Sequence, residues 1–327
     1  MTRLVEALPT PPSLLILTYH RVGDAQKTPY DSGTFSCTGA ELDRQVAFLK
    51  QRFPIVNLDQ AVELVHGRAT TAHASILLTF DDGYRDNYEE AFPVMRRNGV
   101  SATFFLPTAF VGTSLLPWWD TIAYIAKNSK RDRIALTYPP SPDSQPAEFD
   151  LTPANRTHAI VAILKLFKHS QTADAESFIS QLEAACDCPR PTASAERCFL
   201  NWDEAREMQA NGMCFGSHTH THEIMGKLPY TRQLEELTTS RAILERELGR
   251  PIDTLAYPVG QPDSFSPDTF KALAEANYSS AFSFYRGINI PGTIAPFDVL
   301  RRGVDGESPA IFRLRIALRA TTRKELF

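Results

Sequence analysis

Two aspartates and two histidines stand where the chain could build a metal-dependent hydrolytic site. Asp81 and Asp82 directly follow an apolar run, and His218 and His222 lie four positions apart behind another one. One carboxylate and two imidazoles can hold a zinc-type ion and leave a position open for water. The other carboxylate is then free to act as a base. This pattern predicts hydrolysis by a metal-bound water.

The two carboxylates are expected to have different roles, because successive side chains of an extended segment point to opposite sides. Asp81 and Asp82 end such a segment, and the chain turns at Gly83. One carboxylate can reach a metal while its neighbour faces the water from another direction. Asp-Asp-Gly is also ordinary turn chemistry, in which aspartate satisfies backbone donors and glycine takes a positive φ. The histidines favour the metal site over the turn.

Three histidines alternate with serine and threonine in the segment SHTHTH, which ends at His222. A helical turn would place His218 and His222 on one face and direct His220 elsewhere. An extended segment would align all three on one side and leave the aspartates without a role. We therefore expect a helical turn that carries two metal ligands.

These two segments resemble motifs of the polysaccharide deacetylase family, the NodB-homology carbohydrate esterases. TFDDGY, ending at Tyr84, resembles the first motif, and SHTHTH resembles the second, in the same order. The resemblance implies that Asp81 is the catalytic base. It implies that Asp82, His218 and His222 are the metal ligands. It also implies that the backbone N–H of Tyr84 helps to hold the oxyanion.

The chain departs from the family pattern at two places. Tyr257 and Pro258 resemble the third motif, in which an arginine normally stands four positions before the proline, but that position is Thr254 here. The last motif of the family supplies a histidine as general acid, and no histidine follows His222. Another group must therefore protonate the leaving amine.

Other residues are expected to complete the site. His20 ends an apolar strand whose carboxyl end should face the same pocket, so it is the first candidate for the proton donor. Protonated Asp81 could also return its proton, with His20 assisting. Arg301 or Arg302 is expected to stabilise charge only, since arginine is a poor proton donor. Tyr257, Pro258 and Trp118 are the expected substrate contacts. Packing in a core is the competing explanation for Trp118.

Strand-like and helical patterns alternate along the chain, which predicts a parallel sheet. We expect an α/β fold, a distorted, TIM-barrel-like parallel (β/α) barrel of about seven strands. The resemblance implies the same fold, with the metal at the carboxyl ends of the strands. Helices are expected after a capping box at Thr38 and over residues 86–98 and 232–248. The strand-like runs are residues 14–19, 75–80, 102–106, 213–216, 254–257, 279–283 and 298–301.

Residues 115–197 interrupt this alternation with a proline-rich tract and two helical patterns, over residues 153–169 and 173–185. We expect a mostly helical insertion within a single NodB-like domain that spans residues 1–327. A loop of this length is usually functional or carries its own structure. The insertion is expected either to cover the catalytic face, where it would shape substrate choice, or to be a peripheral packing unit.

Composition limits the possible partners. The 327 residues are 43% hydrophobic, which allows a large core, and their formal net charge of -4 gives no basic footprint for nucleic acid. No run approaches the roughly twenty apolar residues that span a bilayer. The apolar stretch at residues 14–17 is too short for the core of a signal peptide. We therefore expect a cytoplasmic protein.

The sequence thus predicts a metal-dependent hydrolase of carbohydrate metabolism that removes an N-acetyl group from a sugar or glycan precursor. One divalent ion is expected, with zinc as first choice, and this oxygen and nitrogen ligand set also suits cobalt, nickel or iron. One alternative is a metal hydrolase of another acyl amide or of an O-acetyl ester. The other is a non-catalytic carbohydrate-binding protein that keeps the fold. The sequence does not indicate the oligomeric state.

Overall fold

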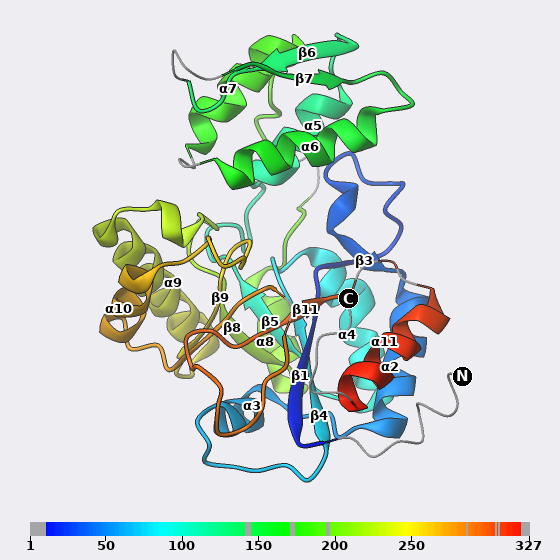
Figure 1. Cartoon of the computed structure of the whole chain (residues 1–327), viewed down its shortest axis with the longest axis vertical. Coiled ribbons are helices and arrows are strands. Elements are labelled where there is room, and N and C mark those ends of the chain that lie inside the picture. The colour runs from blue at the N-terminus through cyan, green and yellow to red at the C-terminus, as the bar shows by residue number, and fades with distance from the viewer. Residues whose placement is uncertain are drawn as a thin grey trace. The chain divides into compact units, whose positions relative to one another are not determined.

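Figure 1 shows the computed structural model of the chain, which divides into two compact units. The first unit comprises Met1–Gly23, Phe35–Gly112 and Phe199–Phe327, and the second comprises Asp24–Thr34 and Thr113–Cys198. The structure describes residues 11–140, 145–170, 174–193, 197–285, 287–304, 306 and 308–321, the last five of these without their side chains.

A seven-stranded sheet with the strand order β10-β9-β8-β5-β4-β1-β11 forms the centre of the first unit (Figure 1). Every pair of neighbouring strands in this sheet is parallel, as the alternation of helices and strands predicts. The strands are β1 (Ser13–Tyr19), β4 (Ala74–Phe80), β5 (Thr103–Leu106), β8 (Cys214–Ser217), β9 (Thr254–Ala256), β10 (Ser280–Phe282) and β11 (Arg302–Gly303).

The segment that leads into β11 joins the two edges of this sheet. Val299 forms a parallel bridge with Phe282 of β10, and β11 itself pairs with β1 at the other edge. The buried amide of Asn289 reinforces the seam, because its Nδ2 donates to the carbonyl oxygens of both Leu14 and Leu300. The sheet therefore curves into the predicted distorted (β/α) barrel, which the segment 299–303 closes between β10 and β1.

Strand alternation sends one set of side chains into the barrel. Buried apolar residues from successive strands form one cluster there, together with those of α3 (Leu58–Val65), a helix that the sequence analysis did not predict. Gly216 of β8 belongs at this inner face, since a Cβ at its position would lie 2.5 Å from the ring of Phe105. The strand members of the cluster are Leu14, Ile16, Leu77, Phe105, Cys214, Ala256, Phe282 and Val299.

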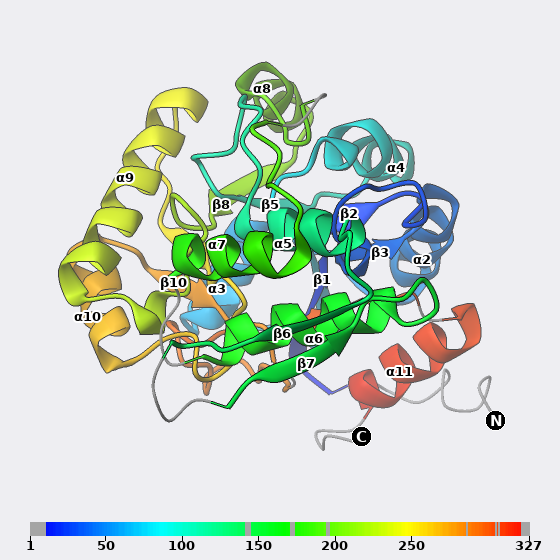
Figure 2. The ribbon, with the colours of Figure 1, turned by 90° about the horizontal axis from the view of Figure 1, so that it is seen from above.

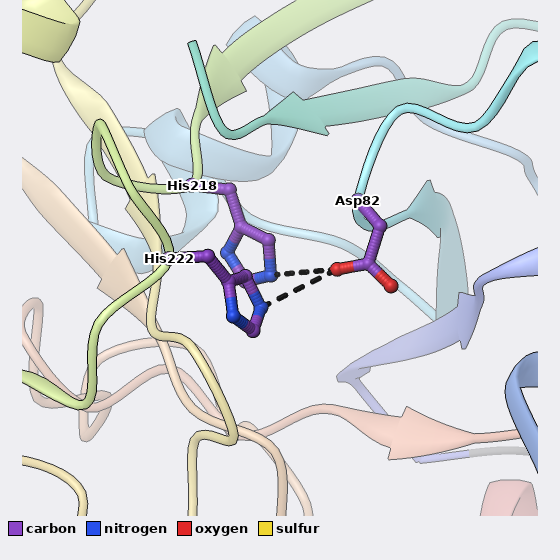
Figure 3. A group of neighbouring side chains, drawn as sticks. All are labelled: Asp82, His218 and His222. Carbon is purple, nitrogen blue, oxygen red and sulfur yellow. Dashed lines mark ion pairs between the residues drawn. The ribbon is translucent and has the colours of Figure 1, made fainter. Parts of the chain in front are cut away.

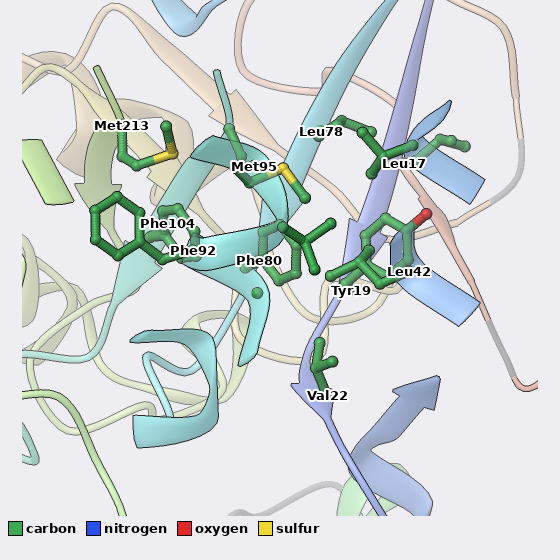
Figure 4. Packing of buried hydrophobic residues seen from close by; sticks show 14 of the residues in the cluster. Leu17, Tyr19, Val22, Leu42, Leu78, Phe80, Phe92, Met95, Phe104 and Met213 are labelled. Carbon is green, nitrogen blue, oxygen red and sulfur yellow. The ribbon is translucent and has the colours of Figure 1, made fainter. Parts of the chain in front are cut away.

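The opposite face of the sheet carries a row of aromatic rings across β1, β4, β5 and β8. Tyr19, Phe80, Phe104 and Phe215 are register partners in turn, with ring centroids 5.1, 4.9 and 5.8 Å apart. Figure 4 shows the first three among the buried side chains that cover them. Burial of such a ring contributes about 1.5–3 kcal/mol. The row thus fixes the register of these strands at the level of Tyr19 and Phe80, the residues before His20 and Asp81.

Helices surround the barrel, as the view from above shows (Figure 2). α2 (Gly39–Arg52) begins at the predicted capping box, in which Thr38 and Glu41 each accept a hydrogen bond from the other's backbone N–H. The predicted helix over residues 86–98 is a π-helical turn (Asn87–Ala91) followed by α4 (Phe92–Asn98). No helix in the described ranges is long and apolar enough to cross a membrane. The remaining elements of the first unit are α8 (Trp202–Ala210), α9 (Tyr230–Leu248), α10 (Pro267–Glu275), α11 (Pro309–Thr321), the 3-10 turn Met225–Lys227, and a pair of parallel strands, β2 (Arg21–Val22) and β3 (Phe35–Cys37). The 3-10 turn Ser32–Thr34 belongs to the second unit.

The second unit contains helices at both predicted helical patterns, α6 (Arg156–His169) and α7 (Ala175–Cys186). Two features of this unit were not predicted from the sequence, namely its first helix, α5 (Trp118–Lys127), and an antiparallel strand pair, β6 (Arg133–Leu136) and β7 (Ala147–Asp150). Trp118 is buried, and its ring centroid lies 4.7 Å from that of Phe167 in α6. In this unit Trp118 therefore packs within an aromatic core.

Candidate active site

The parallel strand order brings the predicted residues to one edge of the barrel. His20 directly follows β1, Asp81 follows β4 and His218 follows β8. The carboxyl ends of parallel strands meet at the same edge, which is where barrel enzymes place their chemistry. Asp81, His218 and Arg301 also lie at inner positions of the strand alternation, two residues beyond Thr79, Gly216 and Val299.

Asp82, His218 and His222 converge on one point. Figure 3 shows both imidazoles directed at Oδ1 of Asp82, which lies 3.5 Å from Nε2 of His218 and 3.4 Å from Nε2 of His222. All three side chains are buried. Three ligands at zinc bond lengths and tetrahedral angles lie about 3.4 Å apart. The residues therefore fit a small divalent ion.

The hydrogen bond made by the other ring nitrogen of His218 prepares it as a ligand. Its Nδ1 lies 2.7 Å from the carbonyl oxygen of Ala256 in β9. A carbonyl oxygen only accepts, so Nδ1 carries the proton and Nε2 presents its lone pair to the ligand set. Such a bond is the usual means by which a protein fixes the tautomer and orientation of a metal-binding histidine.

The predicted helical turn over the histidine segment is wrong. Residues 218–222 form an irregular loop, in which Thr219 has a φ of 66° and His222 a φ of 59°. These left-handed conformations end the strand abruptly and turn the second imidazole back toward the first. A local bond supports the turn, since Oγ1 of Thr219 accepts from the N–H of His222 at 3.0 Å. Asp82 is also left-handed, with a φ of 71°, so backbone strain concentrates at the proposed ligands.

Asp81 is held by Arg301 from the far end of the chain. Nη1 and Nη2 of Arg301 donate to the two carboxylate oxygens of Asp81 at 2.7 and 2.8 Å, and Nε donates to the carbonyl oxygen of Ser283 at 3.0 Å. The Arg301 side chain is fully buried and lies 5.4 and 5.9 Å from the ring centres of Phe105 and Phe284. Of the two arginines proposed from the sequence, the structure therefore places Arg301 in the site.

The ion pair with Arg301 keeps the carboxyl group of Asp81 ionised. Burial by itself would raise the pKa of its carboxyl group, but the charge and hydrogen bonds of Arg301, aided by His218 and His20, hold the pKa below its ordinary value. Oδ2 of Asp81 lies 3.9 Å from Nε2 of His218, next to the ligand set. The site thus contains an ionised carboxylate that is near the three converging side chains but bound to an arginine instead.

His20 lies at the same edge and is half-buried. Its backbone is fixed by two hydrogen bonds, because its N–H donates to Oγ of Ser36 and its carbonyl oxygen accepts from Nδ2 of Asn87. Its ring packs edge-on against Phe284 with a centroid distance of 5.5 Å. Burial acts to raise the pKa of Asp82, but the neighbouring imidazoles outweigh it and hold that pKa well below its ordinary value. His20 is thus held in place at the edge of the barrel that also carries Asp81 and Asp82.

Tyr84, Tyr257 and Arg302 also lie in the barrel unit. Tyr84 is fully buried, with its ring stacked 4.8 Å from that of Phe199. Tyr257 is buried as well, and its hydroxyl group donates to the carbonyl oxygen of Phe297. Arg302 is half-buried at the strand position next to Arg301, which alternation turns to the other face. The role of the Tyr84 N–H and the substrate contacts of Tyr257 and Arg302 remain predictions.

The two remaining predicted contacts also stay predictions. Pro258 is buried directly after Tyr257, and Trp118 belongs to the second unit. Glu236 of α9 contacts the histidine loop, is 1% exposed and was not predicted from the sequence. It falls on the helix face that buries Leu237 and Leu244. A charged residue on a buried face requires partners, and this could have identified it.

The chain belongs to the polysaccharide deacetylase family, as comparison with known sequences shows. The sequence profile of that family, polysaccharide deacetylase, matches residues 68–135 and 126–281. A stretch of 37 residues is 49% identical to the Bacillus subtilis strain 168 protein YxkH, whose name assigns it to the same family. That match covers 11% of this chain and 13% of YxkH.

Solved structures show the same fold. IcaB from Ammonifex degensii is similar with a TM-score of 0.60 at 20% identity, over 96% of this chain and 99% of that one. The Streptococcus pyogenes deacetylase PplD, solved in complex with acetate, is similar with a TM-score of 0.59 at 15% identity, over 94% and 98% of the two chains. At these identities the likeness shows that the chain has the same barrel fold as these two structures.

Proposed function

We propose that this protein is a metal-dependent hydrolase that removes the acetyl group from the nitrogen of a sugar or glycan precursor. Family membership supports deacetylation. The observation that carries the proposal is the position of Asp81, a buried carboxylate paired with Arg301 beside the converging Asp82, His218 and His222. A binding module would have no need for a second carboxylate at that point.

The residues present divide the chemistry among themselves. An ion held by Asp82, His218 and His222 would polarise the acetyl carbonyl group and make a water molecule more acidic. Asp81 accepts a proton from that water while the water oxygen attacks the carbonyl carbon of the acetyl group. Arg301 keeps Asp81 ionised and fixes its orientation, and each carboxylate oxygen still has a lone pair for the water. The backbone N–H of Tyr84 is proposed to donate to the oxyanion.

Collapse of the tetrahedral adduct completes the reaction. The carbon–nitrogen bond breaks, the sugar nitrogen takes up one proton, and the acyl group leaves as acetic acid, which ionises to acetate in water. Asp81 holds the proton taken from the water and can return it. His20 is the second proposed donor, since it directly follows β1 at the edge of the barrel where Asp81 and Asp82 also lie.

Replacement of His20 by glutamine tests the donor role. We expect kcat on an N-acetyl sugar to fall about 10²-fold, while kcat on 4-nitrophenyl acetate, whose leaving group needs no proton, changes little. The measurement is the ratio of the two rates at saturating metal. His73→Gln, at an exposed position outside the site, is the matched control. An equal fall on both substrates would show that His20 acts by supporting the site instead of donating a proton.

The proposed function itself is tested by acetate release from a panel of N- and O-acetylated sugars. The protein is stripped with a chelator and then reloaded with zinc or cobalt. We expect release from an N-acetyl sugar that is lost on stripping and restored by metal. Release that survives complete removal of metal would contradict the metal-dependent mechanism.

The same panel separates the alternatives. Release from O-acetyl sugars alone would assign an esterase, because the metal site does not read the atom to which the acetyl group is attached. Tight binding of metal without release from any acyl substrate would favour a carbohydrate-binding protein that keeps the fold.

A further inference from the structure

The loop that carries both histidines has an unusual acidic contact. Glu236 of α9 is 1% exposed, and its Oε2 accepts hydrogen bonds from the backbone N–H groups of His220 at 2.8 Å and Thr221 at 2.7 Å. Its Oε1 accepts from the hydroxyl group of Thr221 at 2.7 Å. One side chain of a neighbouring helix therefore holds the middle of the loop, between the two histidines.

This loop needs external support, because its backbone is neither helix nor strand. Its carbonyl groups are held from another side, where the N–H groups of Thr108 and Ala109 donate to the carbonyl oxygens of Thr219 and His220 at 3.3 and 2.9 Å. Glu236 supplies acceptors for N–H groups that point the opposite way. Hydrogen bonds from both directions therefore stabilise a turn in which Thr219 and His222 adopt left-handed conformations that cost free energy.

We propose that Glu236 is a positioning residue that sets the metal affinity of the site by holding the histidine loop in its ligating conformation. His218 and His222 stand on either side of the residues that Glu236 binds, so the distance between their imidazoles depends on this turn. A ring centroid distance of 4.7 Å brings both Nε2 atoms to one carboxylate oxygen. A loop free to relax would separate them. The inference rests on the proposed metal site and not on the acyl substrate.

The carboxylate is the chemistry that this position requires. Two backbone N–H groups and a hydroxyl group all donate to it, and hydrogen bonds to a charged acceptor are about twice as strong as those between neutral groups. Arg232, one helical turn earlier, lies 3.4 Å from Oε1 and offsets part of the charge of the buried acid. A glutamine would keep the shape but would present an amide hydrogen to one of these donors.

The test is zinc binding by the full-length protein, measured by competition with a chromogenic chelator. Supports of metal ligands typically change affinity about 10–100-fold when removed, so we expect the zinc Kd of Glu236→Ala to rise by that factor. Glu236→Gln should show a smaller rise. Glu235→Ala, at the adjacent residue whose side chain is 60% exposed, should bind zinc as the native chain does. Excess zinc should restore acetate release in both Glu236 variants.

The outcomes separate positioning from general stabilisation. If Glu236→Ala unfolds more easily but binds zinc with the native Kd while folded, the proposal is overturned. Where Glu236→Ala does not fold, Glu236→Gln decides in the same way, since an unchanged Kd overturns the proposal and a raised one supports it. A native protein that binds zinc but releases no acetate would remove the proposed function and leave this inference intact.

Discussion

The Asp81→Asn variant is expected to release acetate about 10²–10⁴-fold more slowly than the native protein while binding zinc with nearly native affinity. An amide nitrogen and oxygen cannot take the proton of the attacking water. The metal should stay bound, because the converging set is Asp82, His218 and His222, whereas Asp81 is bound to Arg301. The readouts are kcat at saturating zinc and the zinc Kd from chelator competition.

Asp82→Asn is the matched comparison, since it makes the same chemical change one residue away. It should lose zinc affinity and, with it, activity. The two variants together separate the base from the ligand. A loss of zinc binding in Asp81→Asn would mean that Asp81 ligates the metal, and native activity in that variant would remove it from the mechanism.

The second large effect is expected at Arg301, where we predict that Arg301→Met lowers the free energy of unfolding by about 3–5 kcal/mol. The substitution fills much of the same volume but leaves the carboxylate of Asp81 buried without its cation. In the native protein the lowered pKa of Asp81 means that this pair stabilises the fold at neutral pH. Its contribution is lost only as the pH falls below the ordinary aspartate value of about 3.9. Urea unfolding at pH 7 measures the change.

A double substitution tests the cause of this effect. Arg301→Met combined with Asp81→Asn removes the unpaired charge, so the double variant should be more stable than Arg301→Met alone. Arg68→Met, which breaks an exposed pair with Glu63, should change stability little. If the double variant is no more stable than the single one, lost packing and not the buried charge explains the role of Arg301.

The Arg301→Met variant also has an expected pH profile. Without the guanidinium group, burial dominates the pKa of Asp81 and raises it. The pH below which kcat/KM falls should therefore move upward, since the base must be ionised to accept a proton. An acid limb at the native position would show that another group controls this side of the profile.

Much of the barrel could be predicted from the sequence alone. Apolar runs of strand length, each followed by a helical pattern, predict parallel strands, and local hydrogen bonds such as the capping box at Thr38 depend on neighbours in sequence. The placement of Asp81 and His218 followed as well. Each directly succeeds a buried strand, and the carboxyl ends of parallel strands meet at one edge.

Only the tertiary structure decided which distant groups complete the site. Arg301 reaches Asp81 across 220 positions because the segment 299–303 closes the barrel. The histidine loop is not helical, since its shape depends on Glu236 and on residues 108–109 from other elements. Residue types and their order along the chain predicted the proposed ligands, and local preferences predicted the strands, because a strand depends mainly on its neighbours in sequence. Strand order and register determined the partners of Asp81 and of the histidine loop, because contacts between remote segments depend on how the whole chain packs.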